Sequence, residues 1–351
     1  MVSTTVQNRN GLFSNPLFIR SLGWSNLWVM FAYLFNNFAT FWGGLPGASL
    51  QNGLIGFLQL LLYPAAVVLA VVWTLRRRDA TLRQDSFKIS NMNAFVIRAA
   101  FWIVVLMGCV DSLISFLRVE DMLSSLVGEA MDKNLGRSQF RGPYVHVPLM
   151  IMGILLATRT KTLGFHWLAL LIVVGELMIV IFRFIFSYEQ AFMSDLVRFW
   201  YGALFLFASA HTLLEEGHVR VDIVYAGLKE KSKGRINAIG TIFLGISLCW
   251  MIILTGMAQK TSIINSPLLN FETTQSGFGL YVKYMMAGFL GIFAISMMIQ
   301  FVSYLMAAAA GVEKLSHLDE IMCKIHGVIK EVIIGGKMEK PAQILMQTKG
   351  I

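Results

Sequence analysis

The stretch Gly217-His218-Val219-Arg220-Val221-Asp222-Ile223-Val224-Tyr225 is the longest break between strongly apolar segments in the second half of this chain. Charged residues alternate here with β-branched ones, and a block rich in lysine follows as far as Arg235. Long apolar runs flank the stretch on both sides. This arrangement is typical of a polar connector between two membrane helices.

The composition points to the same class of protein. Of 351 residues, 56% are hydrophobic and 14% are charged, whereas soluble domains carry about 25% charged residues. The apolar runs have the length that crosses a hydrocarbon core of roughly 30 Å. We therefore expect an all-α polytopic membrane protein. Its net charge of +9 reflects basic loops at the membrane rather than a nucleic-acid partner.

About eight transmembrane helices are expected, together with amphipathic helices at the membrane surface. Apolar residues at helical spacing predict one surface helix over 119–131 and another in the tail that begins at Glu313. The expected spans are 24–42, 54–75, 95–117, 144–158, 163–186, 196–214, 236–258 and 279–310.

The basic residues orient these helices. With eight crossings and a cytoplasmic amino terminus, most of the 29 Lys and Arg residues fall on the cytoplasmic side. This asymmetry favours cytoplasmic locations for both termini and for the connector 217–235. The 119–131 helix then faces the periplasm.

Charged residues inside membrane helices are costly and are candidates for functional sites. Asp111 and Glu176 lie deepest, and either could bind an ion or a proton. The favoured interpretation is an acid that points into the helix bundle and bonds a hydroxyl. Arg183, Asp195 and Arg198 form a charge cluster at the outer ends of two successive helices, where an Arg183–Asp195 pair could clamp the hairpin.

Three histidines, His146, His166 and His211, lie near the ends of apolar runs. His166 and His211 fall at the same level, which leaves open a haem-binding anchor subunit of an oxidoreductase. Placement at the membrane interface is favoured, because amphipathic side chains keep their polar tips in water. The sequence contains no phosphate-binding loop, zinc-protease motif or nucleophile elbow. We expect no enzyme activity, no cofactor and no metal.

The order of residues in the connector resembles a known family, the small permease subunit (Q-type component) of tripartite ATP-independent periplasmic (TRAP) transporters. That family has four spans and a similar cytoplasmic connector between the second and the third. The resemblance covers about residues 163–310 and includes Arg183-Phe184 and Asp195 at the ends of the first two spans. The connector positions that match are Gly217, His218, Arg220, Asp222, Tyr225 and Leu228.

The resemblance implies three regions. Residues 1–160 form an amino-terminal membrane region of about four helices outside the family pattern, 161–312 form the four-helix region, and 313–351 form an amphipathic cytoplasmic tail. It further implies a scaffold in the bacterial inner membrane that holds a large permease. An ion gradient, normally sodium, would drive uptake of a small organic solute, commonly a carboxylate, which a periplasmic binding protein delivers. A self-sufficient carrier of eight helices remains an alternative.

Overall fold

The computed structural model describes residues 15–188, 190, 192–215, 223–228, 230–272 and 280–310. These residues belong to the first of two compact units, Met1–Gly311. They form helices joined by loops and contain no strand in the ranges described. The expectation of an all-α membrane protein is confirmed. The expected tail helix from Glu313 lies outside the described residues.

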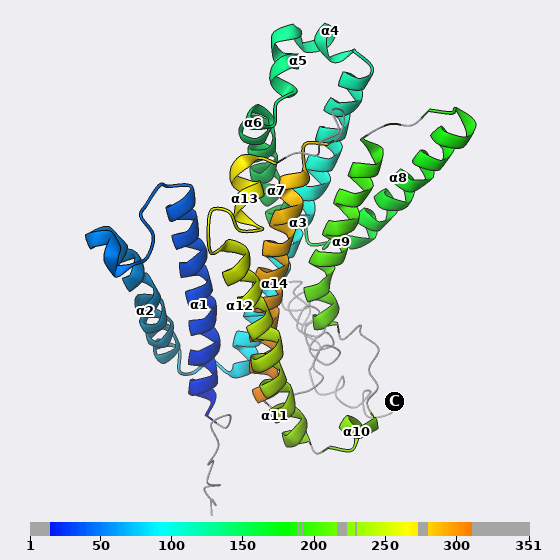
Figure 1. Cartoon of the computed structure of the whole chain (residues 1–351). Helices are drawn as coiled ribbons and strands as arrows, with labels where there is room; N and C mark the ends of the chain where they lie inside the picture. Colours follow the sequence, from blue (N-terminus) through cyan, green and yellow to red (C-terminus); the bar gives the residue numbers. More distant parts are fainter. Residues whose placement is uncertain are drawn as a thin grey trace, which may run out of the picture. The chain divides into compact units, whose positions relative to one another are not determined.

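The helices follow the expected apolar runs, with short helices between them (Figure 1). The longer helices are α1 (Pro16–Phe41), α2 (Gly53–Arg76), α3 (Leu82–Val119), α7 (Val147–Arg159), α8 (Phe165–Ile185), α9 (Met193–Leu214), α11 (Glu230–Gly240), α12 (Ser247–Met257) and α14 (Lys283–Ala309). The shorter ones are η2 (Leu50–Asn52), α4 (Leu123–Val127), α5 (Glu129–Leu135), α6 (Ser138–Arg141), η3 (Gly142–His146), α10 (Ile223–Ala226), η4 (Thr241–Ile246) and α13 (Asn265–Asn270).

Six helical segments among the described residues are long and apolar enough to cross a membrane. They are Leu50–Arg76, Leu82–Val119, Ser138–Arg159, Phe165–Ile185, Ser232–Met257 and Lys283–Ala309. Helices α1 and α9 have 26 and 22 residues, but their polar side chains and tryptophans lower their hydropathy. The count of eight spans and the cytoplasmic termini remain predictions.

Helix α3 begins 13 residues before the expected start of the third span at 95. Thr81 caps it: its hydroxyl accepts from the Gln84 N–H, and the Gln84 side chain accepts from the Thr81 N–H. Such a reciprocal cap stabilises a helix start. The polar residues that follow, including Asp85 and Asn93, are buried against other helices. The apolar run alone therefore underestimated the length of α3.

The prediction of a single surface helix over 119–131 was wrong. The chain forms two short helices there, α4 and α5, separated at Gly128 with φ of +84°. A glycine adopts this left-handed conformation without the steric cost that other residues incur. The break at Gly128 redirects the chain, and the helical spacing of the apolar residues does not persist across it.

Helix α14 is the centre of the described fold and packs against α1, α3, α9 and α12 (Figure 1). Its two halves contribute to two different apolar clusters. One cluster joins Phe289 to α3 and α9 through Met107, Phe199 and Phe207. The other joins the carboxyl half of α14 to α1, α3 and α12. Helices α3 and α14 contribute to both clusters and therefore hold the bundle together.

Polar side chains join the antiparallel helices α3 and α14. The Gln300 side-chain oxygen accepts from Ser90 at 3.3 Å and from Asn93 at 3.1 Å. Nearby, the hydroxyls of Ser86 and Ser303 lie 3.0 Å apart. In a membrane, where lipid is as apolar as leucine, such bonds and close packing are the main forces between helices.

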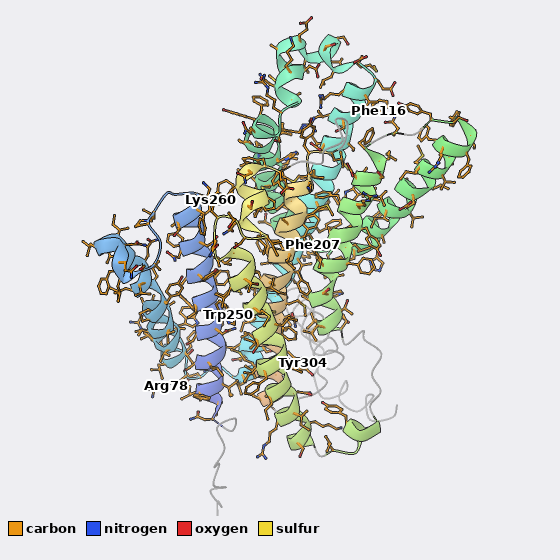
Figure 2. All side chains as sticks on the ribbon, in the orientation of Figure 1. Arg78, Phe116, Phe207, Trp250, Lys260 and Tyr304 are labelled. Atoms are coloured by element: carbon orange, nitrogen blue, oxygen red, sulfur yellow. The ribbon has the colours of Figure 1, made fainter. Side chains whose placement is uncertain are left out.

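Helix α1 is attached to α12 by an aromatic donor. The Nε1–H of Trp250, labelled on α12 in Figure 2, is a hydrogen-bond donor. It donates to the Asn26 Oδ1 of α1 at 2.7 Å. The Trp250 ring also lies edge-on to Tyr33, with centroids 6.3 Å apart. Helix α1 therefore contacts the second half of the chain directly and not only its neighbour α2.

Candidate functional site

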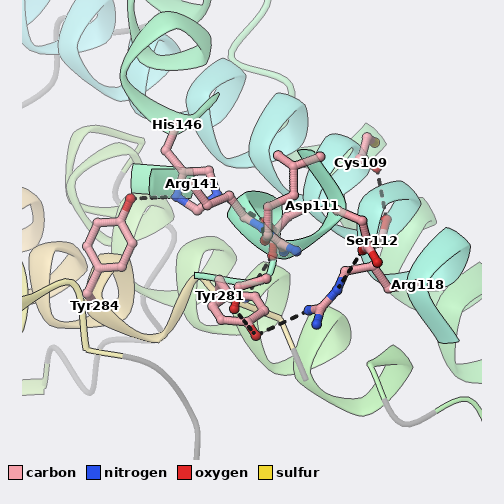
Figure 3. A network of polar contacts seen from close by, with 11 residues as sticks. Cys109, Asp111, Ser112, Arg118, Arg141, His146, Tyr281 and Tyr284 are labelled. Atoms are coloured by element: carbon pink, nitrogen blue, oxygen red, sulfur yellow. Dashed lines mark hydrogen bonds and ion pairs between the residues drawn. The ribbon is translucent and has the colours of Figure 1, made fainter. Parts of the chain in front are cut away.

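A network of buried polar side chains lies around Asp111 of α3 (Figure 3). The Asp111 Oδ1 accepts from Arg141 Nη1 at 2.8 Å and lies 3.0 Å from His146 Nε2. Its Oδ2 accepts from the backbone N–H of Tyr281 at 2.8 Å. We call Asp111, Arg141, His146, Tyr281 and Tyr284 the Asp111 network. It gathers residues from three separate parts of the chain.

Both ring nitrogens of His146 lie within hydrogen-bonding distance of a polar side chain. The carboxylate of Asp111 can only accept, so His146 Nε2 carries a proton toward it. The other ring nitrogen, Nδ1, lies 2.6 Å from the Tyr284 hydroxyl. The Tyr284 hydroxyl can either donate or accept, so both ring nitrogens of His146 have a hydrogen-bond partner.

Arg141 is fully buried and lies against an aromatic face. Its Cζ is 4.2 Å from the centroid of the Tyr281 ring, and its Nε donates to the Leu135 carbonyl at 2.9 Å. The Tyr281 hydroxyl donates to the Gly136 carbonyl at 3.0 Å and accepts from Arg118 at 3.2 Å. Tyr281 thus fastens the loop before α6 to the segment before α14.

The network pairs one carboxylate with one guanidinium, and the His146 imidazole lies between that carboxylate and the Tyr284 hydroxyl. Asp111, Arg141 and His146 each have 0% of their surface exposed. A buried charge is tolerated only when it is paired and hydrogen-bonded. The arrangement can therefore fix helices rigidly in register. Among the described residues, no group of three or more His, Cys, Asp or Glu side chains could hold a metal ion.

A second buried ion pair lies at the opposite end of α3. The Asp85 Oδ2 accepts from Arg20 Nε at 2.8 Å and from Trp24 Nε1 at 3.0 Å. Arg20 also donates to the backbone carbonyl of Arg77 at 2.9 Å, at the end of α2. This pair joins α1, α2 and α3. Helix α3 is thus held by a buried ion pair near each end and by the bonds to Gln300 between them.

Residues 172–311 match the family model described as the DctQ component of tripartite ATP-independent periplasmic transporters. The match covers 140 of the 351 residues, and we call residues 172–311 the TRAP region. The matched range begins within α8 and ends just after α14. No curated protein and no solved structure matched the chain. The resemblance read from the sequence is confirmed, and this part of the chain is a TRAP small permease region.

The Asp111 network joins this TRAP region to the helices that precede it. Tyr281 and Tyr284 lie inside the matched range, whereas Asp111, Arg141 and His146 lie before it. The bonds of Gln300 to Ser90 and Asn93 cross the same boundary. The helices before residue 160 are therefore bonded to the TRAP helix α14 through buried polar groups, in addition to apolar contacts.

Most of the family connector lies outside the described residues, including Gly217, His218, Arg220 and Asp222. Tyr225 of α10 is described, and its hydroxyl accepts from Asn237 of α11 at 2.7 Å. The Lys233 Nζ lies 5.7 Å from the centroid of the same ring. Leu228 is half-buried just after α10. Tyr225 thus anchors the end of the connector to the next helix of the TRAP region.

At the α8–α9 hairpin, the expected charge cluster of Arg183, Asp195 and Arg198 does not come together as an Arg183–Asp195 ion pair in the described structure. Asp195 is half-buried in the first turn of α9, while Arg183 and Arg198 are exposed. The described residues form no ion pair between Arg183 and Asp195. An acid in the first turn of a helix is stabilised by the free N–H groups there, so Asp195 has a favourable position without a cation.

Three sequence expectations about polar residues need correction. Asp111 binds an arginine, a histidine and a backbone N–H instead of a hydroxyl. Glu176 is exposed, and it bonds no hydroxyl in the described residues. His146 is fully buried rather than interfacial, because it fills the space between Asp111 and Tyr284. His166 is exposed, and the ring of His211 lies 5.6 Å from that of Phe165.

Sequence reasoning missed Arg141, which lies between the expected spans 95–117 and 144–158. Arg141 follows a polar stretch and precedes Gly142 and Pro143, a pattern typical of a loop. The one signal that could have found it is Asp111 itself. An acid within an apolar helix requires a cation, and Arg118, Lys133, Arg137 and Arg141 were the nearest candidates on the same side of the membrane.

Proposed function

We propose that this chain is the small membrane subunit of a TRAP-type secondary transporter and that it scaffolds a large permease subunit. The observation that carries the proposal is the family match over 172–311, which covers most of α8 and all of α9 to α14.

The transport reaction follows from the family. An ion gradient, taken to be sodium, drives uptake of a small organic solute across the bacterial inner membrane. A periplasmic binding protein delivers the solute, which is commonly a carboxylate. The large permease moves it. In this arrangement the small subunit contacts the permease and the lipids and does not hold the solute.

The polar groups of the described fold suit a stationary scaffold. Asp111 and Asp85 are engaged in buried ion pairs, and Gln300 bonds two side chains of α3. Each of these interactions fixes one helix against another. A part that holds still while the permease moves benefits from such rigid contacts, because packed polar networks specify a single arrangement.

The three regions read from the sequence acquire distinct roles. Residues 161–312 are assigned to the TRAP scaffold, and the tail 313–351, which lies outside the described residues, is assigned to the cytoplasmic side. Residues 1–160 brace the scaffold, because α3 reaches α14 through the Asp111 network and through Gln300. On this account the amino-terminal helices are needed for the stability of the TRAP region.

The connector residues Gly217, His218, Arg220 and Asp222 serve subunit architecture and helix orientation rather than catalysis or solute binding. Their order matches the family connector, and a basic cluster beyond them faces the anionic cytoplasmic leaflet. Charge reversal at Arg220 or Asp222 should weaken assembly with the permease. Reversal at Lys260, which lies in the loop after α12 on the opposite side, provides a matched control.

Affinity purification tests the proposal. The tagged chain is expressed with the large permease of the same transporter, solubilised in mild detergent and analysed by size-exclusion chromatography and mass. We expect a stable complex of the two chains. Recovery of the tagged chain without any permease, under conditions where both fold in the membrane, would contradict the proposed function.

A further inference from the structure

Helix α8 is the most exposed of the six candidate spans. It packs mainly against α9, and only 11% of its most apolar 18 residues are buried, compared with 50% for α14. Gly175 lies on the packed side, where a Cβ would come within 3.0 Å of Val197. The opposite side projects away from α9 and from the rest of the described chain (Figure 2).

An acidic residue lies in the middle of this exposed side. Glu176 is 11 residues from the start of α8 at Phe165 and nine from its end at Ile185. Val173, Leu177 and Val180 share its face and are 62%, 55% and 49% exposed. Three and four residues apart, these side chains form one continuous surface along the helix.

Glu176 differs from the other acids in the candidate spans. The described spans contain three acidic residues, Asp85, Asp111 and Glu176. Asp85 and Asp111 are buried and paired with arginines. Glu176 is exposed and forms no hydrogen bond or ion pair with any residue in the described part of the chain. Its carboxylate is placed where lipid tails would surround it.

A carboxylate facing lipid at the centre of a bilayer is costly, and acids within spans nearly always face protein or water. Val173, Leu177 and Val180 make the surface of α8 around this carboxylate apolar. A cation at the same depth would offset the loss of hydration, because an opposite charge stabilises a desolvated carboxylate. The two buried acids of this chain follow that rule.

We infer that the outer face of α8 around Glu176 docks a transmembrane helix of the large permease that presents a Lys or Arg at the membrane midplane. The inference rests on the proposed function, since it assigns the partner's location on this chain. Val173, Leu177 and Val180 pack against the apolar side of the partner helix. Glu176 fixes its depth and register.

Two variants at Glu176 separate docking from folding. Glu176→Leu makes the face uniformly apolar, and Glu176→Gln keeps the shape while it removes the charge. Because Glu176 has no partner in the described chain, thermal unfolding of the isolated subunit should not change in either variant. Co-purified permease should fall about tenfold with Glu176→Leu, since loss of one member of a desolvated charge pair costs at least that factor. The amount of permease that co-purifies with Glu176→Gln should lie between the amounts for wild type and for Glu176→Leu.

Photo-crosslinking identifies what covers the face. A benzophenone amino acid is placed at Val173 or Val180 of the full chain in membranes that also contain the permease. The matched control is Val68 of α2, which is 59% exposed on a different span. We expect a crosslink to the permease from Val173 and Val180, and a markedly weaker one from Val68.

The outcomes distinguish the two proposals. A wild-type chain that retains no permease would overturn the proposed function and the docking site together. A wild-type complex that Glu176→Leu leaves intact would overturn the docking site alone. Crosslinks from Val173 to a second copy of the 39.3 kDa chain, or to lipid only, would also overturn it. Loss of permease with Glu176→Leu and a crosslink to the permease would establish it.

Discussion

Arg141 Nη1 lies 2.8 Å from Asp111 Oδ1, and neither side chain has any exposed surface. The two residues are 30 positions apart, and the short helices α4, α5 and α6 separate them. Their pairing brings the end of α6 back onto α3. The backbone N–H of Tyr281 donates to the other oxygen of Asp111, so this one carboxylate connects the helices before residue 160 to the TRAP region.

Removing one charge of this pair should destabilise the subunit strongly. Asp111→Asn leaves Arg141 buried without a counter-charge, and breaking such a pair costs about 3–5 kcal/mol. Thermal unfolding in detergent measures the loss. Lys133→Ala is the matched control, because the Lys133–Glu129 pair is exposed and pairs of this kind contribute about 0.5 kcal/mol.

Replacing both charges should cost less than the two single changes together. In the double variant Asp111→Leu, Arg141→Met no buried charge remains unpaired, and apolar replacements of buried pairs are often tolerated. A double-mutant cycle measures the coupling between the two sites. Strict additivity of the two single effects would show that Asp111 and Arg141 do not stabilise each other.

The Gln300→Leu variant tests the polar contact between α3 and α14. It removes the acceptor for Ser90 and Asn93 and leaves their donors buried. An unsatisfied buried donor costs about 1–3 kcal/mol, so the unfolding temperature should fall. Thr255→Val is the control, since Thr255 is exposed and bonds only its own helix at Met251.

Gly153 of α7 marks the closest approach to α3. A Cβ at this position would lie 2.8 Å from the backbone nitrogen of Ile103 and 3.0 Å from its Cα. Because backbone atoms cannot move aside, Gly153→Ala should separate the helices and cost about 1–3 kcal/mol. Gly240→Ala, which meets nothing within 4 Å, should be neutral or stabilising in the same unfolding assay.

Tyr188, which lies outside the candidate spans, should lose its proton at a higher pH than an ordinary tyrosine, because its pKa is raised. The Tyr188 hydroxyl donates to Glu120 Oε1 at 2.6 Å, and this hydrogen bond is the main reason why its pKa is raised above 10.0. The bond stabilises the neutral phenol, so its contribution to folding is complete below pH 10 and is lost as the pH rises through the raised value.

Ultraviolet difference titration of wild type against Tyr188→Phe isolates this group from the other tyrosines. In the Glu120→Gln background the same difference curve should move to lower pH, because the carboxylate that accepts the bond is gone. An unchanged curve would mean that the Tyr188–Glu120 bond does not form in solution.

Six of the expected spans overlap helical segments that are long and apolar enough to cross a membrane, because apolar runs are visible in the sequence. Their boundaries were less accurate where polar residues belong to a helix, as with Asp85 and Asn93 in α3. Whether a polar residue is in a loop or buried against a neighbouring helix depends on tertiary contacts, which hydrophobic periodicity does not contain. The error over 119–131 had a similar cause. The spacing of apolar residues favoured one helix, but the chain changes direction at Gly128 and forms two short helices.

Only part of the candidate site could be predicted from the sequence. Asp111 was recognisable as an acid in an apolar run, but its partners Arg141, His146 and Tyr284 lie 30 to 173 positions away. No local pattern links residues at such distances. The family connector was recognisable because its residue order is specific, whereas the buried network lies at a junction that the family pattern does not cover.

Transport by reconstituted vesicles tests the central claim most directly. Vesicles containing the large permease, with the binding protein and labelled solute outside, are given an inward sodium gradient with and without this chain. The account predicts solute uptake only when the chain is present, and a large reduction when it carries Asp111→Asn. Equal uptake by the permease alone would contradict the claim that this chain is the scaffold on which the transporter depends.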